Sequence, residues 1–156
     1  MSDYYTKIET TFDNLDLEKL KQLHCATVGP VDWYWTDVRY VLDQLKSPFW
    51  SKMRPNKIWF YEYDGIGMMP GFGQDKHHMC AVYHFVEPAG GINLFYDGPN
   101  SPTPTDKLEA KQGETWLVNL KARQTMYFPD SAVRQKRQYV GFMYEAFYET
   151  VKSSLL

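Results

Sequence analysis

A succession of short strand-like segments in the second half of the chain restricts the fold more than any other feature of the sequence. Each segment is rich in β-branched or aromatic residues, which favour strands. Glycine, proline and aspartate residues, which favour turns, stand between them. The segments occupy residues 57–64, 77–85, 92–96, 115–120, 125–128 and 138–144. Closely spaced short strands separated by turns predict an all-β sandwich or barrel for this part of the chain.

The first third of the chain has a different periodicity, and we expect residues 1–50 to be helical. Leu17, Leu20 and Leu23 recur at a spacing of three, and an aspartate or asparagine before them could cap a helix. A second helix is expected over 32–46, with its apolar positions on one face and a Ser-Pro pair at its end. The fold class is therefore predicted as α+β, with N-terminal helices packed on an antiparallel β core.

Length and composition indicate one soluble domain. The 156 residues are expected to form a single domain over 1–156, with a helical part over 1–50 and a β core over 57–145. A net charge of −2 gives no electrostatic footprint for nucleic acid or an anionic membrane. Neither a signal peptide nor a membrane span is indicated, and we expect a cytoplasmic protein. The aromatic content of 17% favours rings that line a pocket or a homodimer interface.

The order of the β segments resembles the double-stranded β-helix, or jelly-roll, of the iron/2-oxoglutarate dioxygenase superfamily. It is most similar to the aspartyl/asparaginyl hydroxylase-like branch. The resemblance rests on a strand after a Gly-rich loop, the phrase GETWLVN at 113–119, and Arg137 at the head of the last strand. It implies a cupin-like jelly-roll behind the N-terminal helices. It also implies Fe(II) and 2-oxoglutarate as cofactors if the family activity is retained, and none otherwise.

The resemblance implies that the metal-ligand positions have degenerated. The family binds iron through a His-x-Asp pair and a second histidine, and an arginine holds the distal carboxylate of the co-substrate. His77 matches the first histidine, but Met79 stands at the carboxylate position and Gln124 at the second histidine position. Arg137 matches the family's arginine, and Arg134 is a second candidate. Thus only one of the usual three ligands is retained.

Two other metal arrangements are open in the same region. Asp75 and His77 form a reversed carboxylate-x-histidine pair, which has a suitable spacing. His78 and His84 share one face of a predicted strand, but six residues of strand separate them by roughly 20 Å, which is too far for one metal without a bulge. Histidines on a core strand are otherwise satisfied by hydrogen bonds.

Arg137 is the residue on which a functional interpretation depends most. Its planar guanidinium matches a carboxylate in two parallel hydrogen bonds. If it points into the roll, an anionic ligand or an acidic partner is needed, because an unpaired buried charge is costly. The alternative is a surface ion pair with Glu114 or Asp130. The candidate ligand-binding residues between the sheets are Arg137, Arg134, Tyr83, Trp116, Asn119 and Gln124.

Three functions remain open from the sequence. The first is an oxygenase-like jelly-roll that binds a small anionic molecule or a peptide without the usual iron site. The second is an active Fe(II)/2-oxoglutarate-dependent hydroxylase in which His77 and Asp75 hold the metal. The third is a non-enzymatic structural or assembly protein, since jelly-rolls also build oligomers.

Overall fold

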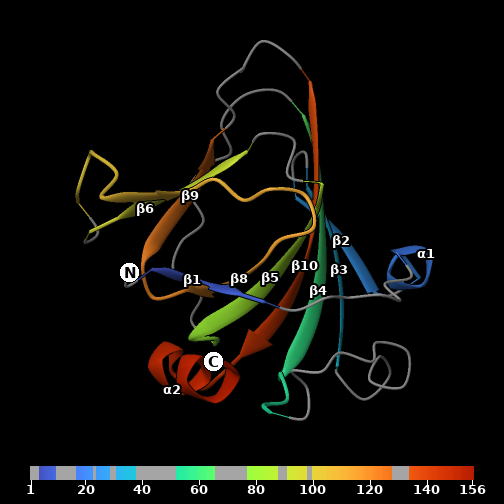
Figure 1. Ribbon diagram of the computed structural model, residues 1–156. Coiled ribbons are helices and arrows are strands. Elements are labelled where there is room, and N and C mark those ends of the chain that lie inside the picture. Colours follow the sequence, from blue (N-terminus) through green and yellow to red (C-terminus); the bar gives the residue numbers. More distant parts are fainter. Residues whose placement is uncertain are drawn as a thin grey trace.

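Two antiparallel β-sheets and two helices make up the described structure (Figure 1). This computed structural model describes residues 4–9, 17–22, 24–28, 31–37, 52–65, 77–87, 91–97, 100–127 and 134–156. All described strand pairs are antiparallel. This arrangement is consistent with the jelly-roll that the sequence predicted.

The larger sheet has seven strands, and its order is β1-β8-β5-β10-β4-β3-β2. In that order the strands are β1 (Tyr5–Ile8), β8 (Thr115–Asn119), β5 (Cys80–Glu87), β10 (Gln135–Tyr144), β4 (Lys57–Gly65), β3 (Val31–Asp37) and β2 (His24–Val28). The last strand of the chain, β10, therefore lies in the middle of this sheet. It pairs with β5 on one side and with β4 on the other.

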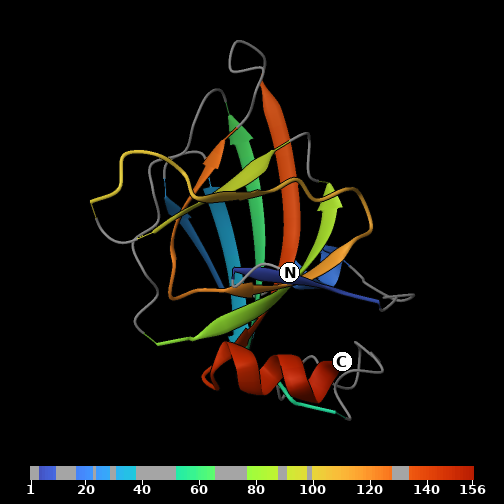
Figure 2. The same ribbon diagram turned by 60° about the vertical axis from the view of Figure 1, so that its left-hand side comes forward.

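The smaller sheet has three strands in the order β7-β6-β9. These are β7 (Asp106–Leu108), β6 (Ile92–Tyr96) and β9 (Arg123–Tyr127). Figure 2 shows the small sheet lying in front of the long strands of the large sheet. The strands β4, β5, β6, β8, β9 and β10 confirm the six strand segments predicted from the sequence, whereas the short β7 was not predicted.

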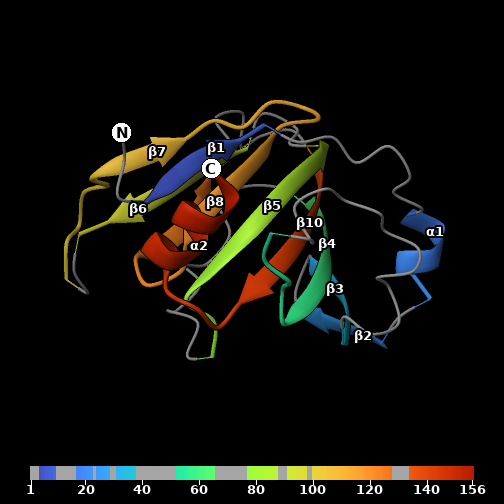
Figure 3. The same ribbon diagram turned by 60° about the horizontal axis from the view of Figure 1, so that its bottom comes forward.

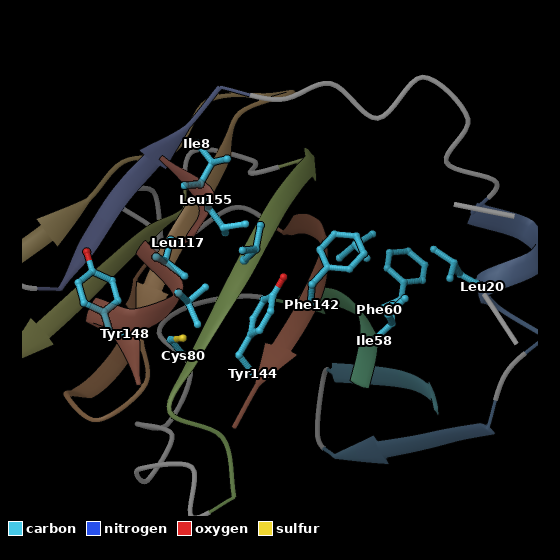
Figure 4. Packing of buried hydrophobic residues seen from close by; sticks show 13 residues of the cluster. Ile8, Leu20, Ile58, Phe60, Cys80, Leu117, Phe142, Tyr144, Tyr148 and Leu155 are labelled. Atoms are coloured by element: carbon cyan, nitrogen blue, oxygen red, sulfur yellow. The ribbon is translucent and has the colours of Figure 1, made fainter. Parts of the chain in front are cut away.

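The alternation of side chains along the central strands builds one hydrophobic cluster on each face of the large sheet. In β5, Cys80 and Val82 belong to the outer cluster, and Ala81, Tyr83 and Phe85 belong to the inner cluster. The inner cluster includes residues of the small sheet and so fills the space between the sheets. The outer cluster, shown in Figure 4, lies on the opposite face.

Helix α2 (Tyr148–Leu155) covers part of the outer face. Its buried side chains are Tyr148, Val151 and Leu155, which recur at spacings of three and four and so share one side of the helix. Figure 3 shows α2 in front of β8 and β5. This C-terminal helix was not predicted from the sequence. None of the helices in the described parts of the chain has the length and apolar character needed to cross a membrane.

The prediction of a helical N-terminal part is wrong. Residues 1–50 contribute β1, β2 and β3, and the only helix described there is α1 (Leu17–Leu20), a single turn. The second predicted helix, 32–46, overlaps β3 in its first part, and its remainder lies outside the described residues. The physical reason is the aromatic and β-branched character of the β3 sequence, VDWYWTD, which favours pairing with β4 over a helix.

Candidate functional site: a buried arginine between two sheets

Arg137 lies near the start of β10 with its side chain completely buried, at 0% exposure. The alternation along β10 gives it the same face as Tyr139, and both residues pair with tyrosines of β4, Tyr63 and Tyr61. This is the inner face of the large sheet. The guanidinium is therefore positioned by a central strand that has a neighbour on each side.

One hydrogen bond links this guanidinium to the small sheet. Arg137 Nη2 donates to Asn93 Oδ1 at 2.6 Å, and Asn93 belongs to β6. The guanidinium carbon also lies 5.1 Å from the centre of the Phe85 ring and 5.5 Å from that of Tyr139. Both distances fall within the range of cation–π attraction. The amide of Asn93 thus connects the arginine to the small sheet, whereas both ring contacts lie within the large sheet.

These contacts leave the guanidinium incompletely satisfied. Its Nε and Nη1 atoms are buried without a hydrogen-bond partner among the described residues. In the same part of the chain, no carboxylate forms an ion pair with Arg137. Burial lowers the pKa of Arg137 to about 10, which still leaves it charged at neutral pH. A buried cation is costly without a counter-charge, and none is described beside this guanidinium.

Aromatic rings from three neighbouring strands surround this position. Tyr139 stacks on Tyr61 of β4 at a centroid distance of 4.7 Å and an interplanar angle of 24°. It meets Tyr83 of β5 edge-on at 4.9 Å and lies 5.6 Å from Phe85. Burial raises the pKa of the Tyr139 phenol to about 12, so the ring is neutral at ordinary pH. The surroundings of the guanidinium are therefore apolar and aromatic.

A glycine in β10 makes room for one of these rings. Gly141 is the cross-strand neighbour of Tyr83. A Cβ atom at position 141 would lie 3.0 Å from Cε1 and 3.3 Å from Cδ1 of Tyr83. The absence of a side chain at 141 therefore allows the Tyr83 ring to lie close to β10 and to reach Tyr139.

The other predicted pocket residues differ in where they lie. Tyr83 belongs to the aromatic group beside Arg137. Trp116 faces the same side, opposite Tyr83 on β8, but its ring meets Tyr5 at 5.6 Å. Asn119 pairs with Cys80 and so shares the outer face, and its side chain accepts a hydrogen bond from the Lys121 amide at 3.0 Å. The structure therefore brings Tyr83 to the arginine but does not bring Asn119.

Gln124 and Arg134 are engaged elsewhere. Gln124 Nε2 donates to the Asn119 carbonyl oxygen at 3.1 Å. Arg134 is exposed, and its Nε lies 2.6 Å from Asp64 Oδ1 in a surface ion pair. Of the two surface partners considered for Arg137, Glu114 instead pairs with Lys7 at 3.1 Å. The other, Asp130, lies outside the described residues.

Of the residues that the sequence resemblance aligns with metal-ligand positions, two are not usual ligands of ferrous iron. His77 is exposed and precedes β5, and Met79 and Gln124 offer a thioether and an amide in place of a carboxylate and an imidazole. Asp75, the proposed carboxylate partner of His77, lies outside the described residues. Among the residues that are described, no group of three or more His, Cys, Asp or Glu side chains could hold a metal ion.

The alternative histidine pair is divided between two environments. His78 is buried, and its ring meets Trp59 edge-on at 5.6 Å. His84 Nδ1 is hydrogen-bonded to Thr115 Oγ1 at 2.9 Å, and burial lowers the pKa of His84 below its usual value. His84 therefore has the hydrogen bond expected of a core histidine.

Sequence reasoning missed most of the residues that surround Arg137. Phe85, Tyr139 and Tyr61 lie on predicted strands, and Tyr139 is two residues from Arg137, so the alternation of β10 could have placed it beside the arginine. Asn93 also lies on a predicted strand, β6. However, no local pattern indicates which strand of the small sheet faces Arg137.

The comparisons with known proteins show the fold alone. No protein-family model matches the chain, and no curated protein is significantly similar to it in sequence. A 2OG-Fe(II) oxygenase family oxidoreductase from Burkholderia pseudomallei is similar in structure, with a TM-score of 0.57 and 10% identity over 89% of this chain and 82% of that one. Vicilin from hazelnut, Corylus avellana, has a TM-score of 0.55 and 11% identity over 81% of this chain, which spans 33% of the vicilin chain. The chain thus shares a jelly-roll fold with these two proteins.

Proposed function

We propose that this jelly-roll protein binds a small organic anion, as a free molecule or as part of a peptide, through a carboxylate held by Arg137. The observation that carries the proposal is a guanidinium that is fully buried yet, among the described residues, hydrogen-bonded through Nη2 alone. Nε and Nη1 together carry three of the five N–H donors of a guanidinium. A carboxylate would supply both the missing charge and the missing acceptors.

The rest of the site supports binding rather than iron chemistry. The positions that hold iron in the dioxygenase superfamily carry Met79 and Gln124, neither of which is a usual ligand of ferrous iron. Arg137, by contrast, stands where the resemblance places the family's carboxylate-binding arginine. We therefore propose an oxygenase-like protein that retains anion binding without the usual iron site.

Thermal unfolding with and without carboxylates tests the proposal. We expect millimolar 2-oxoglutarate, succinate or benzoate to raise the melting temperature, because a ligand that binds only the folded state stabilises it. Arg137→Met should abolish the response. Arg134→Met is the matched control, because it removes a guanidinium from a surface ion pair and should leave the response intact. Equal responses from wild type and Arg137→Met, or no response to any acid, would overturn the proposal.

A second variant supplies the missing carboxylate from the protein itself. Asn93→Asp would place a carboxylate where Asn93 Oδ1 lies, 2.6 Å from Arg137 Nη2. We expect this variant to be more stable than wild type without ligand and to lose its response to carboxylates. A variant that still responds as wild type does would show that the acids bind elsewhere.

The alternative function is an active Fe(II)/2-oxoglutarate-dependent hydroxylase with non-standard ligands. The observation in its favour is the fold shared with a protein of that family. It requires His77 and Asp75 to hold the metal. Under anaerobic conditions, Fe(II) should then increase the stabilisation by 2-oxoglutarate in wild type but not in His77→Ala. The same response in both proteins would exclude this assignment.

A structural or assembly role is the third candidate. It would show as a stable oligomer in light scattering that neither carboxylates nor Arg137→Met affects. A monomer that responds to carboxylates only when Arg137 is present would exclude it.

A further inference from the structure

The surroundings of Arg137 also bear on which anion the site would take. We propose that the ligand is an aromatic monocarboxylate, that is, a single carboxylate attached to a flat ring. This inference rests on the proposed function, because it concerns the same site. It adds two properties of the ligand: its charge, and the aromatic character of the group attached to the carboxylate. Each property follows from a separate observation.

The charge follows from the number of buried cations. Arg137 is the one buried arginine or lysine among the residues that the structure describes. Its hydrogen-bond partner among the described residues is Asn93, a neutral amide, and the contacting rings of Phe85 and Tyr139 carry no charge. One carboxylate neutralises one guanidinium. A dianion would bring a second negative charge into a site with no described cation to balance it, which is unfavourable at low dielectric constant.

The aromatic body follows from the rings around the guanidinium. Phe85 and Tyr139 touch it, and Tyr61 and Tyr83 meet Tyr139 face-on and edge-on. Aromatic pairs in these two orientations attract each other beyond the effect of burial alone. A flat ring joined to the carboxylate could therefore continue the arrangement of rings already present. A saturated chain of similar size would gain burial but not the ring contacts.

The contacts of Asn93 are consistent with a carboxylate at this place. Its Oδ1 accepts from Arg137, and this is the only hydrogen bond of its side chain in the described structure. The amide Nδ2 is a further N–H donor on the same residue. A carboxylate is an acceptor with several lone pairs and can take hydrogen bonds from a guanidinium and an amide together.

A series of four small molecules separates charge from aromaticity. Benzoate is the aromatic monoanion, cyclohexanecarboxylate has the same charge without aromaticity, succinate is an aliphatic dianion, and benzamide is aromatic and neutral. Calorimetry should show benzoate binding about tenfold more tightly than cyclohexanecarboxylate, which corresponds to about 1.4 kcal/mol. Succinate should bind more weakly than benzoate, and benzamide should not bind.

The possible results distinguish this inference from the proposed function. If cyclohexanecarboxylate equals benzoate, or if succinate binds more tightly than benzoate, the aromatic monocarboxylate is overturned while the anion site remains. If none of the acids binds, or if benzamide binds as well as benzoate, the proposed function itself fails.

A ring-deleting variant tests the role of the aromatic group. Tyr139→Leu should reduce the ratio of benzoate to cyclohexanecarboxylate affinity towards one, because the ring that contacts Arg137 is removed. Tyr144→Phe is the control on the opposite face of the same strand and should keep the wild-type ratio. Since the readout is a ratio within one protein, a general loss of stability does not imitate the effect. An unchanged ratio in Tyr139→Leu would overturn the aromatic part of the inference.

Discussion

At the scale of single residues, Arg137 is the least expected occupant of its position. Its neighbours in the large sheet include Tyr63 of β4 and the Phe85 ring of β5, yet it brings a charge into the interior. One hydrogen bond and two ring contacts offset only part of the cost of removing that charge from water. Residues of this kind commonly serve function at the expense of stability.

This reasoning predicts the stability of Arg137→Met without ligand. Methionine has a similar length and no charge, so we expect the free energy of unfolding to stay the same or rise by about 1–4 kcal/mol. Urea unfolding measures this, with Arg134→Met expected to change the free energy by no more than about 0.5 kcal/mol. A large loss of stability in Arg137→Met would contradict the view that the guanidinium is under-paired.

Gly141 gives the second prediction at this scale. Gly141→Ala should destabilise the protein by about 1–3 kcal/mol, because its methyl group would displace the Tyr83 ring. The control is a double-mutant cycle in urea unfolding, in which Gly141→Ala should cost less when Tyr83→Ala has already removed the ring. Equal costs in the two backgrounds would show that Tyr83 is not the residue that Gly141 accommodates.

At the scale of elements, β10 organises the molecule by presenting both of its faces to a hydrophobic cluster. Val140, Phe142 and Tyr144 belong to the outer cluster, whereas Met143 belongs to the inner one. The register between β10 and β5 shifts between Gln138 and Tyr139, beside the arginine. Such irregularities bend a strand and re-aim its side chains, and they are common next to functional sites.

Helix α2 provides the prediction for an element. Leu155 is 5% exposed and packs in the outer cluster, whereas the adjacent Leu156 is 66% exposed. Leu155→Ala should lower the free energy of unfolding by about 2–5 kcal/mol, because it removes buried methyl groups and leaves a cavity. Leu156→Ala should change it by no more than about 0.5 kcal/mol. Similar effects of the two substitutions in urea unfolding would contradict the packing of α2 on the sheet.

At the scale of the whole molecule, stability should depend on pH at both ends of the range. On the acid side, burial alone would raise the pKa of Glu62, but a hydrogen bond from Gln138 and the charges of Lys136 and Lys21 lower it below its usual value. A lowered folded-state pKa contributes stability that is present above the ordinary pKa. This contribution is lost as the pH falls through the folded-state value. The stability of Glu62→Gln should therefore decrease less steeply with falling pH than that of wild type. Acid titrations followed by circular dichroism measure this.

On the alkaline side, buried phenol and thiol groups change the stability in the opposite direction from Arg137. Burial raises the pKa of Tyr139 and of Cys80 to about 12, so each contributes stability that is lost as the pH rises towards that value. Burial lowers the pKa of Arg137 to about 10, so the unfolded chain keeps this proton longer and stability is gained above that pH. Because the buried phenol and thiol groups outnumber the buried arginine, we expect a net loss of stability as the pH rises.

This balance predicts a steeper alkaline loss in Arg137→Met than in wild type. The substitution removes the opposing contribution, and it also removes the charge that lowers the pKa of Tyr139. Urea midpoints measured between pH about 8 and 11 would show the difference. Parallel curves for the two proteins would contradict the burial of the charged guanidinium.

Features that depend on neighbouring residues could be predicted from the sequence. The alternation of β4, β5 and β10 is local, so the strands of the second half and the shared face of Ala81, Tyr83 and Phe85 could be predicted. The chemistry of arginine likewise singled out Arg137, because a guanidinium at the head of a core strand requires an acceptor wherever it points.

Contacts between residues far apart in the sequence followed from the folded structure alone. The segments that form β1 and β2 have a weak local preference, and their pairing with β8 and β3 fixes them as strands. The contact of Asn93 with Arg137 joins positions 44 residues apart on different sheets. Backbone pairing and burial between distant segments outweigh local propensity, and short sequence patterns do not indicate which segments will pair. For the same reason, the sequence does not reveal that the guanidinium of Arg137 has a single hydrogen bond among the described residues.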